Sequence, residues 1–118
     1  MSELEGLIAR VEAAGGPDRE VDLAIHWLLI NDGEPLAVMG SFGIIDLPAY
    51  TSSLDAALKL VEAKLPGWDY LVARVSDGCS AEVGPPDSFQ QIEAKAPTPA
   101  LALILALLRA LAQGGEKP

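Results

Sequence analysis

The sequence predicts a layered domain of the α+β class, an α/β/α sandwich in which four helices surround a small, largely antiparallel sheet. Apolar residues recur at helical spacing in several segments, and these segments carry helix start and stop signals. Asp77-Gly78 is a tight-turn dipeptide between two short extended runs, which is typical of a β-hairpin. No internal repeat or linker divides the 118 residues, so we expect one domain over residues 1–113 and a flexible tail over 114–118.

The N-terminal segment predicts two helices that form a hairpin. Ser2-Glu3-Leu4-Glu5 is a capping box, and the helix that it begins ends at Gly15-Gly16-Pro17. A second helix begins at about Asp18, whose side chain can accept hydrogen bonds from exposed backbone N–H groups. The expected buried stripe of this helix comprises Val21, Ala24, Ile25, Leu28 and Leu29. Because the connecting turn is short, we expect the two helices to pack side by side.

The segment from Pro48 to Trp68 predicts the third helix. Ser52 and Asp55 form a start that resembles a capping box, and Pro66-Gly67 ends the helix. Asp55 and Lys59 lie one turn apart on the outer face. The expected buried stripe comprises Leu54, Ala57, Leu58, Val61 and Leu65. Before this helix, residues 35–39 indicate a short strand, and residues 43–47 indicate either a second strand or an approach to the helix.

The C-terminal half predicts a hairpin followed by a very apolar helix. The hairpin comprises residues 69–75 and 79–83, with the first strand covered on both faces and the second on one. Residues 84–97 indicate a long surface loop. Thr98-Pro99 supplies an N-cap and a proline at the first position of the last helix. That helix, from Ala100 to Gln113, is buried on several sides or contributes a free face to a homodimer.

Composition argues against several classes of partner. Seventeen acidic and eight basic residues give a net charge of −9. This charge disfavours direct binding to nucleic acid or to an anionic membrane, because both need Lys and Arg. The single cysteine, Cys79, excludes an internal disulfide and a Cys-rich zinc site. The longest apolar run, residues 99–108, is about half as long as a membrane-spanning helix, and no signal peptide is visible, so we expect a soluble intracellular protein.

No group of side chains forms a recognisable catalytic or cofactor site. His26 and Cys79 are the only candidates for a thiol–imidazole pair, which would also need an orienting group and an oxyanion site. A structural histidine and a small core cysteine are the favoured interpretation. The segment Gly40-Ser41-Phe42-Gly43 lacks the Lys-Ser/Thr of a phosphate-binding loop and predicts a turn or bulge. We therefore expect no catalytic residue and no cofactor.

Three acidic residues, Asp18, Glu20 and Asp22, crowd the start of the second helix. A calcium loop would need a glycine at its sharp turn and a distant bidentate glutamate, and the sequence offers neither. The helix dipole favours negative charge at an N-terminus, which explains all three residues. We expect no metal site.

Three aromatic residues around the third helix are the best candidates for a protein interface: Tyr50, Trp68 and Tyr70. Aromatic residues concentrate in binding hot spots, although the same positions also suit core packing. The acidic excess suggests a second possibility, mimicry of a nucleic-acid backbone. A mimic would place its carboxylates in rows, whereas here they are scattered over caps, turns and outer helix faces.

Several segments, taken in order, resemble one family. They are Val11-Glu12-Ala13-Ala14-Gly15-Gly16-Pro17-Asp18-Arg19-Glu20-Val21-Asp22, Tyr50-Thr51-Ser52-Ser53-Leu54-Asp55-Ala56-Ala57-Leu58, Leu65-Pro66-Gly67-Trp68, Ala81-Glu82-Val83 and Ala96-Pro97-Thr98-Pro99-Ala100-Leu101-Ala102-Leu103. Together they resemble the phage ABA sandwich domain of small uncharacterised bacteriophage and prophage proteins. The resemblance implies helical layers around a sheet, and it implies no catalytic or binding residues.

The resemblance and the lack of a catalytic constellation together lead to a functional expectation. We expect a non-enzymatic phage or prophage accessory protein that binds a host or phage protein in the bacterial host cytoplasm. Inhibition of a host defence complex, such as a CRISPR effector, is one setting for this activity. The alternatives are an acidic nucleic-acid mimic and a small enzyme of unknown reaction.

Overall fold

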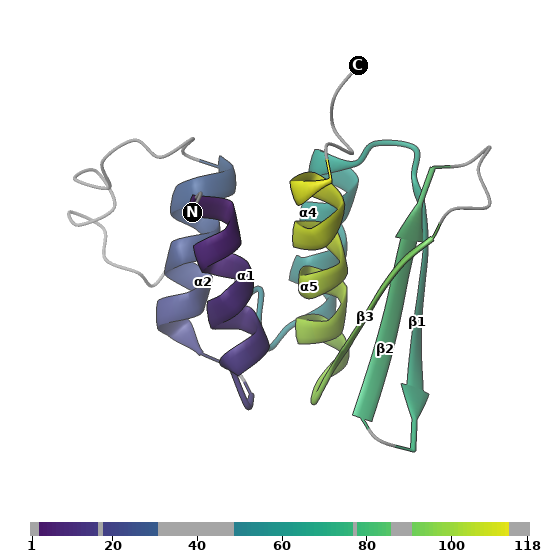
Figure 1. The fold of residues 1–118 in the computed structure, drawn as a ribbon, viewed down its shortest axis with the longest axis horizontal. Helices are drawn as coiled ribbons and strands as arrows, with labels where there is room; N and C mark the ends of the chain where they lie inside the picture. The colour runs from purple at the N-terminus through teal and green to yellow at the C-terminus, as the bar shows by residue number, and fades with distance from the viewer. Residues whose placement is uncertain (1–2, 17, 31–48, 77, 86–90, 114–118) are drawn as a thin grey trace.

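A computed structural model of the chain describes residues 3–16, 18–30, 49–76, 78–85 and 91–113. These residues contain four α-helices and a three-stranded antiparallel sheet (Figure 1). The helices are α1 (Glu3–Ala13), α2 (Arg19–Ile25), α4 (Leu54–Lys64) and α5 (Pro99–Ala112), and α2 continues as a π-helical turn, η1 (His26–Ile30). The strands are β1 (Asp69–Val75), β2 (Gly78–Gly84) and β3 (Ile92–Ala96), in the sheet order β1-β2-β3. The predicted α+β class, with four helices and an antiparallel sheet, is confirmed.

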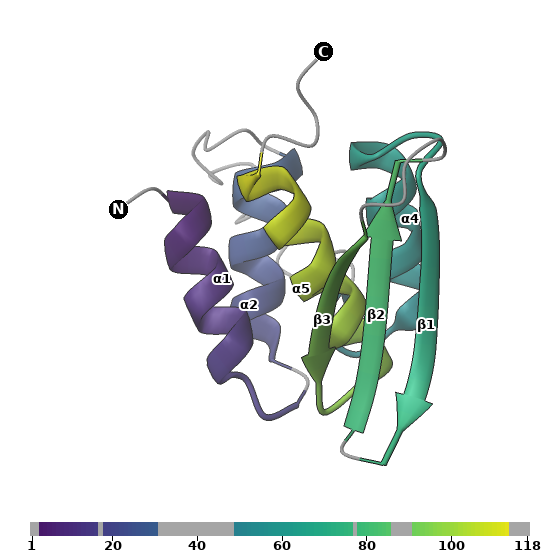
Figure 2. The same cartoon turned by 45° about the vertical axis from the view of Figure 1, so that its right-hand side comes forward.

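The described elements are stacked as a sheet, a first helix pair and a second helix pair. Figure 1 shows α4 and α5 against one face of the sheet, with α1 and α2 on the side of α5 that faces away from the sheet. Figure 2 shows the same arrangement from another direction. Among the described residues, helices therefore cover one face of the sheet, where the sequence predicted helices on both. None of these helices is long and apolar enough to span a membrane.

Helix α5 is the centre of the core. From Ala100 to Leu111 every side chain except that of Arg109 is buried. The helix packs against the sheet on one side and against α1 and α4 on others. Burial within the chain therefore explains why this helix is apolar all round. A homodimer through α5 stays a prediction that this packing does not require.

The predicted hairpin is confirmed in detail. Strands β1 and β2 pair in continuous register from Asp69↔Gly84 to Val75↔Gly78. Gly78 has a φ of +133°, and a Cβ built on it would lie 2.9 Å from the carbonyl oxygen of Ala96. Only glycine fits this position without strain.

The two faces of the sheet differ in exposure. On the helix-facing side, β2 buries its apolar residues, as the alternation predicted: Cys79, Ala81 and Val83. On the other side, Leu71 of β1 is 58% exposed and Val75 is 37% exposed. The prediction that β1 is covered on both faces is wrong, because an apolar run alone does not distinguish a covered strand from an edge strand with exposed side chains.

Strand β3 lies in a segment for which the sequence predicted a loop, and that prediction is wrong for Ile92–Ala96. Two alanines and two charged residues in five positions give little intrinsic preference for a strand. The strand forms because it pairs with β2, where Ala81 is opposite Ala94, and because Ala94 is buried in the core. Tertiary contacts decide its structure.

Helix α4 begins one residue later than predicted. Ser53, not Ser52, is the N-cap, and its Oγ accepts a hydrogen bond from the backbone N–H of Ala56 at 3.2 Å. The predicted outer-face pair is confirmed, with Lys59 Nζ 3.5 Å from Asp55 Oδ2. The buried stripe is confirmed for Ala57, Val61 and Leu65, whereas Leu54 and Leu58 are only half-buried.

The helical hairpin of α1 and α2 is confirmed, as is the N-cap role of Thr98 at the start of α5. Several other predicted features lie outside the described residues. They are the cap at Ser2, the strands at 35–39 and 43–47, the turn Gly40-Ser41-Phe42-Gly43 and the tail over 114–118.

Candidate functional site

The structure gives His26 and Cys79 different neighbours. His26 lies on η1, where its Nδ1 is 3.0 Å from the Tyr50 hydroxyl and the two rings stack with centroids 6.2 Å apart. Burial lowers the pKa of His26. Cys79 lies on β2, and its thiol points to the carbonyl oxygen of Pro97 at 3.9 Å. The contacts of these two residues therefore contain no thiol–imidazole pair.

The acidic residues at the start of α2 have two different roles. Asp18 is the N-cap, and its Oδ1 accepts hydrogen bonds from the backbone N–H groups of Glu20 at 2.9 Å and Val21 at 3.3 Å. This confirms the predicted capping role. Asp22, in contrast, is completely buried, so an exposed acidic first turn does not explain it. No group of three or more His, Cys, Asp or Glu in the described ranges is placed to hold a metal ion.

Asp22 is the centre of a buried polar junction between α2 and the turn that precedes α4. Its Oδ1 accepts a hydrogen bond from the backbone N–H of Thr51 at 2.8 Å, and its Oδ2 accepts one from Arg19 Nη1 at 2.9 Å. The Thr51 hydroxyl accepts from the backbone N–H of Asp18 at 2.8 Å. The pKa of the neighbouring Tyr50 is raised by burial and by the Asp22 carboxylate. The junction fixes the orientation of α2.

The three aromatic residues predicted as an interface lie in different environments. Tyr50 is 4% exposed and directs its hydroxyl to His26, so it is mainly a core residue. Trp68, between α4 and β1, is half-buried against the core. Tyr70 on β1 is 42% exposed. An interface that uses them stays a prediction, and the exposed surface for it is on the β1 side.

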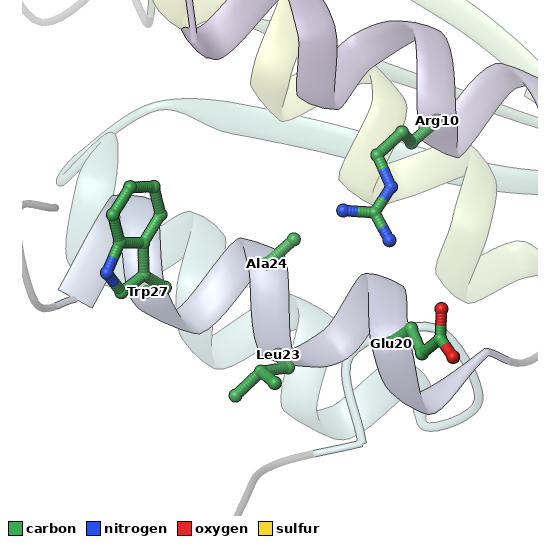
Figure 3. A pocket seen from close by; sticks show the side chains of 5 residues that line it. All are labelled: Arg10, Glu20, Leu23, Ala24 and Trp27. Carbon is green, nitrogen blue, oxygen red and sulfur yellow. The ribbon is translucent and has the colours of Figure 1, made fainter. Parts of the chain in front are cut away.

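An open groove runs between α1 and the α2–η1 segment. It has a volume of about 560 Å³ and is lined by Arg10, Glu20, Leu23, Ala24 and Trp27 (Figure 3). A smaller hollow of about 270 Å³ shares Arg10, Ala24 and Trp27 with it and continues past Gly6, Leu7 and Leu28. The two hollows form one continuous surface, which we call the α1–α2 groove.

The α1–α2 groove has an apolar floor and a charged end. Leu23, Ala24 and Trp27 are all half-buried on one side of the α2–η1 segment. Figure 3 shows the guanidinium of Arg10 and the carboxylate of Glu20 directed from opposite helices toward the space between them. Both charged residues are exposed. Such a surface can bind an apolar side chain and orient a polar or charged group at its end.

The groove face of α2 lies outside the single apolar stripe that the sequence analysis predicts for this helix. The core-facing residues are Val21, Ile25 and Leu29. Leu23 and Trp27 lie four residues apart and form a second stripe outside the predicted one. That spacing is the signal in the sequence that could have indicated an additional apolar face.

No family model, no curated protein and no solved structure matches this chain. The resemblance to the phage ABA sandwich domain therefore stays an expectation.

Proposed function

We propose that this chain is a non-enzymatic binding domain that takes an apolar helix of a partner protein into the α1–α2 groove. The observation that supports this proposal is the position of Trp27, half-buried at the floor of an open groove and flanked there by Leu23 and Ala24. Trp, Tyr and Arg are enriched in binding hot spots, and the groove contains a Trp and an Arg.

The shape of the groove suits a helix. Two packed helices leave a trough between them, and a third helix laid into that trough completes a small bundle. From Glu20 to Trp27 the floor extends over roughly 10 Å, which is about two helical turns. A partner helix with apolar residues three and four positions apart would cover Trp27 and Leu23 together.

The charged end of the groove would fix the direction of the partner helix. Arg10 and Glu20 carry opposite charges on opposite walls. A partner side chain that carries both a hydrogen-bond donor and an acceptor, such as an amide, can bind Arg10 and Glu20 at the same time. Charged groups at the edge of an interface contribute more to specificity and association rate than to affinity.

The phage-family resemblance supports a setting for this activity. In this proposal the chain is a phage or prophage accessory protein of the bacterial host cytoplasm. A protein of a host defence complex, such as a CRISPR effector, is the partner to test first.

The experiment first compares the proteins that the immobilised wild type and variants retain from a bacterial lysate. Each variant is then titrated with the purified partner. Trp27→Ala removes the floor of the groove, and we expect it to weaken binding by about tenfold or more. Gly6→Leu fills the groove from the opposite wall, where a Cβ at Gly6 meets no atom within 4 Å. It also favours the helix, so it should abolish binding without loss of stability.

Lys59→Ala is the control, because it truncates an exposed side chain on α4, which contributes no lining residue to the α1–α2 groove. A partner that binds this control and the wild type equally, but not Trp27→Ala or Gly6→Leu, supports the proposal. A partner unaffected by both groove variants contradicts it. Affinity that falls steeply between about 50 and 200 mM salt, and does not depend on Trp27, would favour nucleic-acid mimicry instead.

A further inference from the structure

We propose that β1 is a second, independent binding site, at which an extended basic segment of a partner protein adds to the sheet as a fourth strand. This site lies on the sheet and does not share residues with the α1–α2 groove. Strand addition to a sheet edge is a common mode of peptide recognition, in which backbone hydrogen bonds supply affinity and alternate side chains supply specificity.

The outer edge of β1 has the geometry that strand addition requires. β1 is at one end of the sheet order, and no strand among the described residues pairs with its outer side (Figure 2). All seven residues of β1 stay in register with β2, without a bulge or a proline. Bulges and prolines are two of the means by which edge strands are protected from pairing.

The exposed side chains of β1 point to the same conclusion. In the part of the chain that the structure describes, the most exposed large hydrophobic side chains all belong to β1: Tyr70 at 42%, Leu71 at 58% and Val75 at 37%. Single exposed apolar residues are ordinary, but their concentration on one edge strand marks an interaction surface. Leu71 and Val75 lie on the helix-free face, because alternate residues of a strand share a face.

The charges around Leu71 indicate the chemistry of the partner. Leu71 is in register with Glu82, and Glu82 is in register with Glu93, whose Oε2 accepts a hydrogen bond from Ser80 Oγ at 3.1 Å, so two acidic residues occupy opposite positions on neighbouring strands. Like charges in directly opposite positions are destabilising. Asp69 lies on the same face, two residues before Leu71, and Lys95 is the basic residue that β3 adds there. On this face of the sheet, Asp69, Glu82 and Glu93 therefore outnumber Lys95, while the exposed Arg74 of β1 lies on the opposite face, in register with Cys79.

This charge distribution favours a basic partner over a second copy of the chain. Each copy carries a net charge of −9, so self-pairing at this edge would bring like charges together. A segment that alternates apolar with Lys or Arg residues would cover Leu71 and Val75 and would neutralise the facing carboxylates. The occupant that fits β1 is thus an extended basic peptide.

The test uses a synthetic fluorescein-labelled peptide, Lys-Val-Lys-Val-Lys-Val-Lys, titrated with the full chain and followed by fluorescence anisotropy. We expect saturable binding that Leu71→Lys weakens by about tenfold or more and Glu82→Gln weakens less, while Trp27→Ala leaves it unchanged. Leu71 is exposed, so its replacement leaves the core intact. The Trp27→Ala result also separates this site from the function proposed above.

Two further peptides and a backbone measurement complete the test. Glu-Val-Glu-Val-Glu-Val-Glu and Lys-Val-Lys-Pro-Lys-Val-Lys should bind far more weakly, because the first reverses the charge and the second removes a backbone donor. Hydrogen exchange should slow at the amides of residues 69–75 when the first peptide binds. The proposal is overturned if the proline peptide binds equally, if protection appears elsewhere, or if light scattering shows a dimer that Leu71→Lys abolishes.

Discussion

Replacing Asp22 with alanine tests whether the buried junction holds α2 in place. The side chain is completely buried and accepts hydrogen bonds from the Thr51 backbone N–H at 2.8 Å and from Arg19 at 2.9 Å. Alanine removes both acceptors. The Thr51 amide then lacks a partner in a buried position, where water cannot easily replace the carboxylate.

The expected magnitude follows from these two contacts. Leaving a buried N–H unsatisfied costs about 1–3 kcal/mol, and the bond to a charged acceptor adds to this loss. The Arg19 side chain is 43% exposed, so water solvates it after the change and its contribution is small. We expect Asp22→Ala to lower the free energy of unfolding by about 2–4 kcal/mol. Asp22→Asn keeps one acceptor for the Thr51 amide and should cost about half as much.

Urea unfolding followed by circular dichroism measures the effect. A thermal melt should show a fall in Tm of roughly 3–6 °C for each kcal/mol. Asp55→Ala is the matched control, because Asp55 is 79% exposed and its ion pair with Lys59 contributes at most about 1 kcal/mol. Equal stability losses for Asp22→Ala and Asp55→Ala would refute the structural role of the junction.

Three further predictions concern the turn, the core and a titrating group. Gly78→Ala forces a Cβ against the Ala96 carbonyl at a φ of +133°. We expect urea unfolding to show a free energy of unfolding lower by about 1–3 kcal/mol, and an unchanged free energy would contradict this geometry. Leu107→Ala, in the fully buried centre of α5, should lower the unfolding free energy by about 2–5 kcal/mol, and a loss below about 1 kcal/mol would contradict this burial. Burial lowers the pKa of His26 below 6.5, so the unfolded chain binds the proton first as the pH falls. The free energy of unfolding should therefore decline as the pH falls from about 6.5 toward the folded-state pKa of His26. A His26→Gln variant with an unchanged pH dependence of stability would contradict this prediction.

The parts of the fold that the sequence predicted are those with strong local signals. Thr98-Pro99 begins α5, Gly78 begins the second strand of the hairpin, and Asp18 caps α2. Each signal acts within a few residues of the element that it starts or ends. The burial of α5 also followed from its composition, because a helix without a polar face must be covered.

The parts that the sequence did not predict depend on contacts between distant segments. β3 has a weak strand preference and forms by pairing with β2. Asp22 is one of three acidic residues at the start of α2, and its burial depends on the distant turn at Thr51. A periodic pattern also does not show which apolar stripe of a helix is covered. The sequence alone therefore does not distinguish the groove face of α2, which carries Trp27, from its core face.

Binding at the α1–α2 groove can be observed directly through Trp27. The chain has two tryptophans, Trp27 and Trp68, so a Trp68→Phe variant leaves Trp27 as the only indole reporter. Partner binding in the groove should bury this half-exposed indole and shift its fluorescence emission to shorter wavelength. A partner that binds the variant with unchanged affinity and leaves the Trp27 emission unaltered would contradict the proposed function.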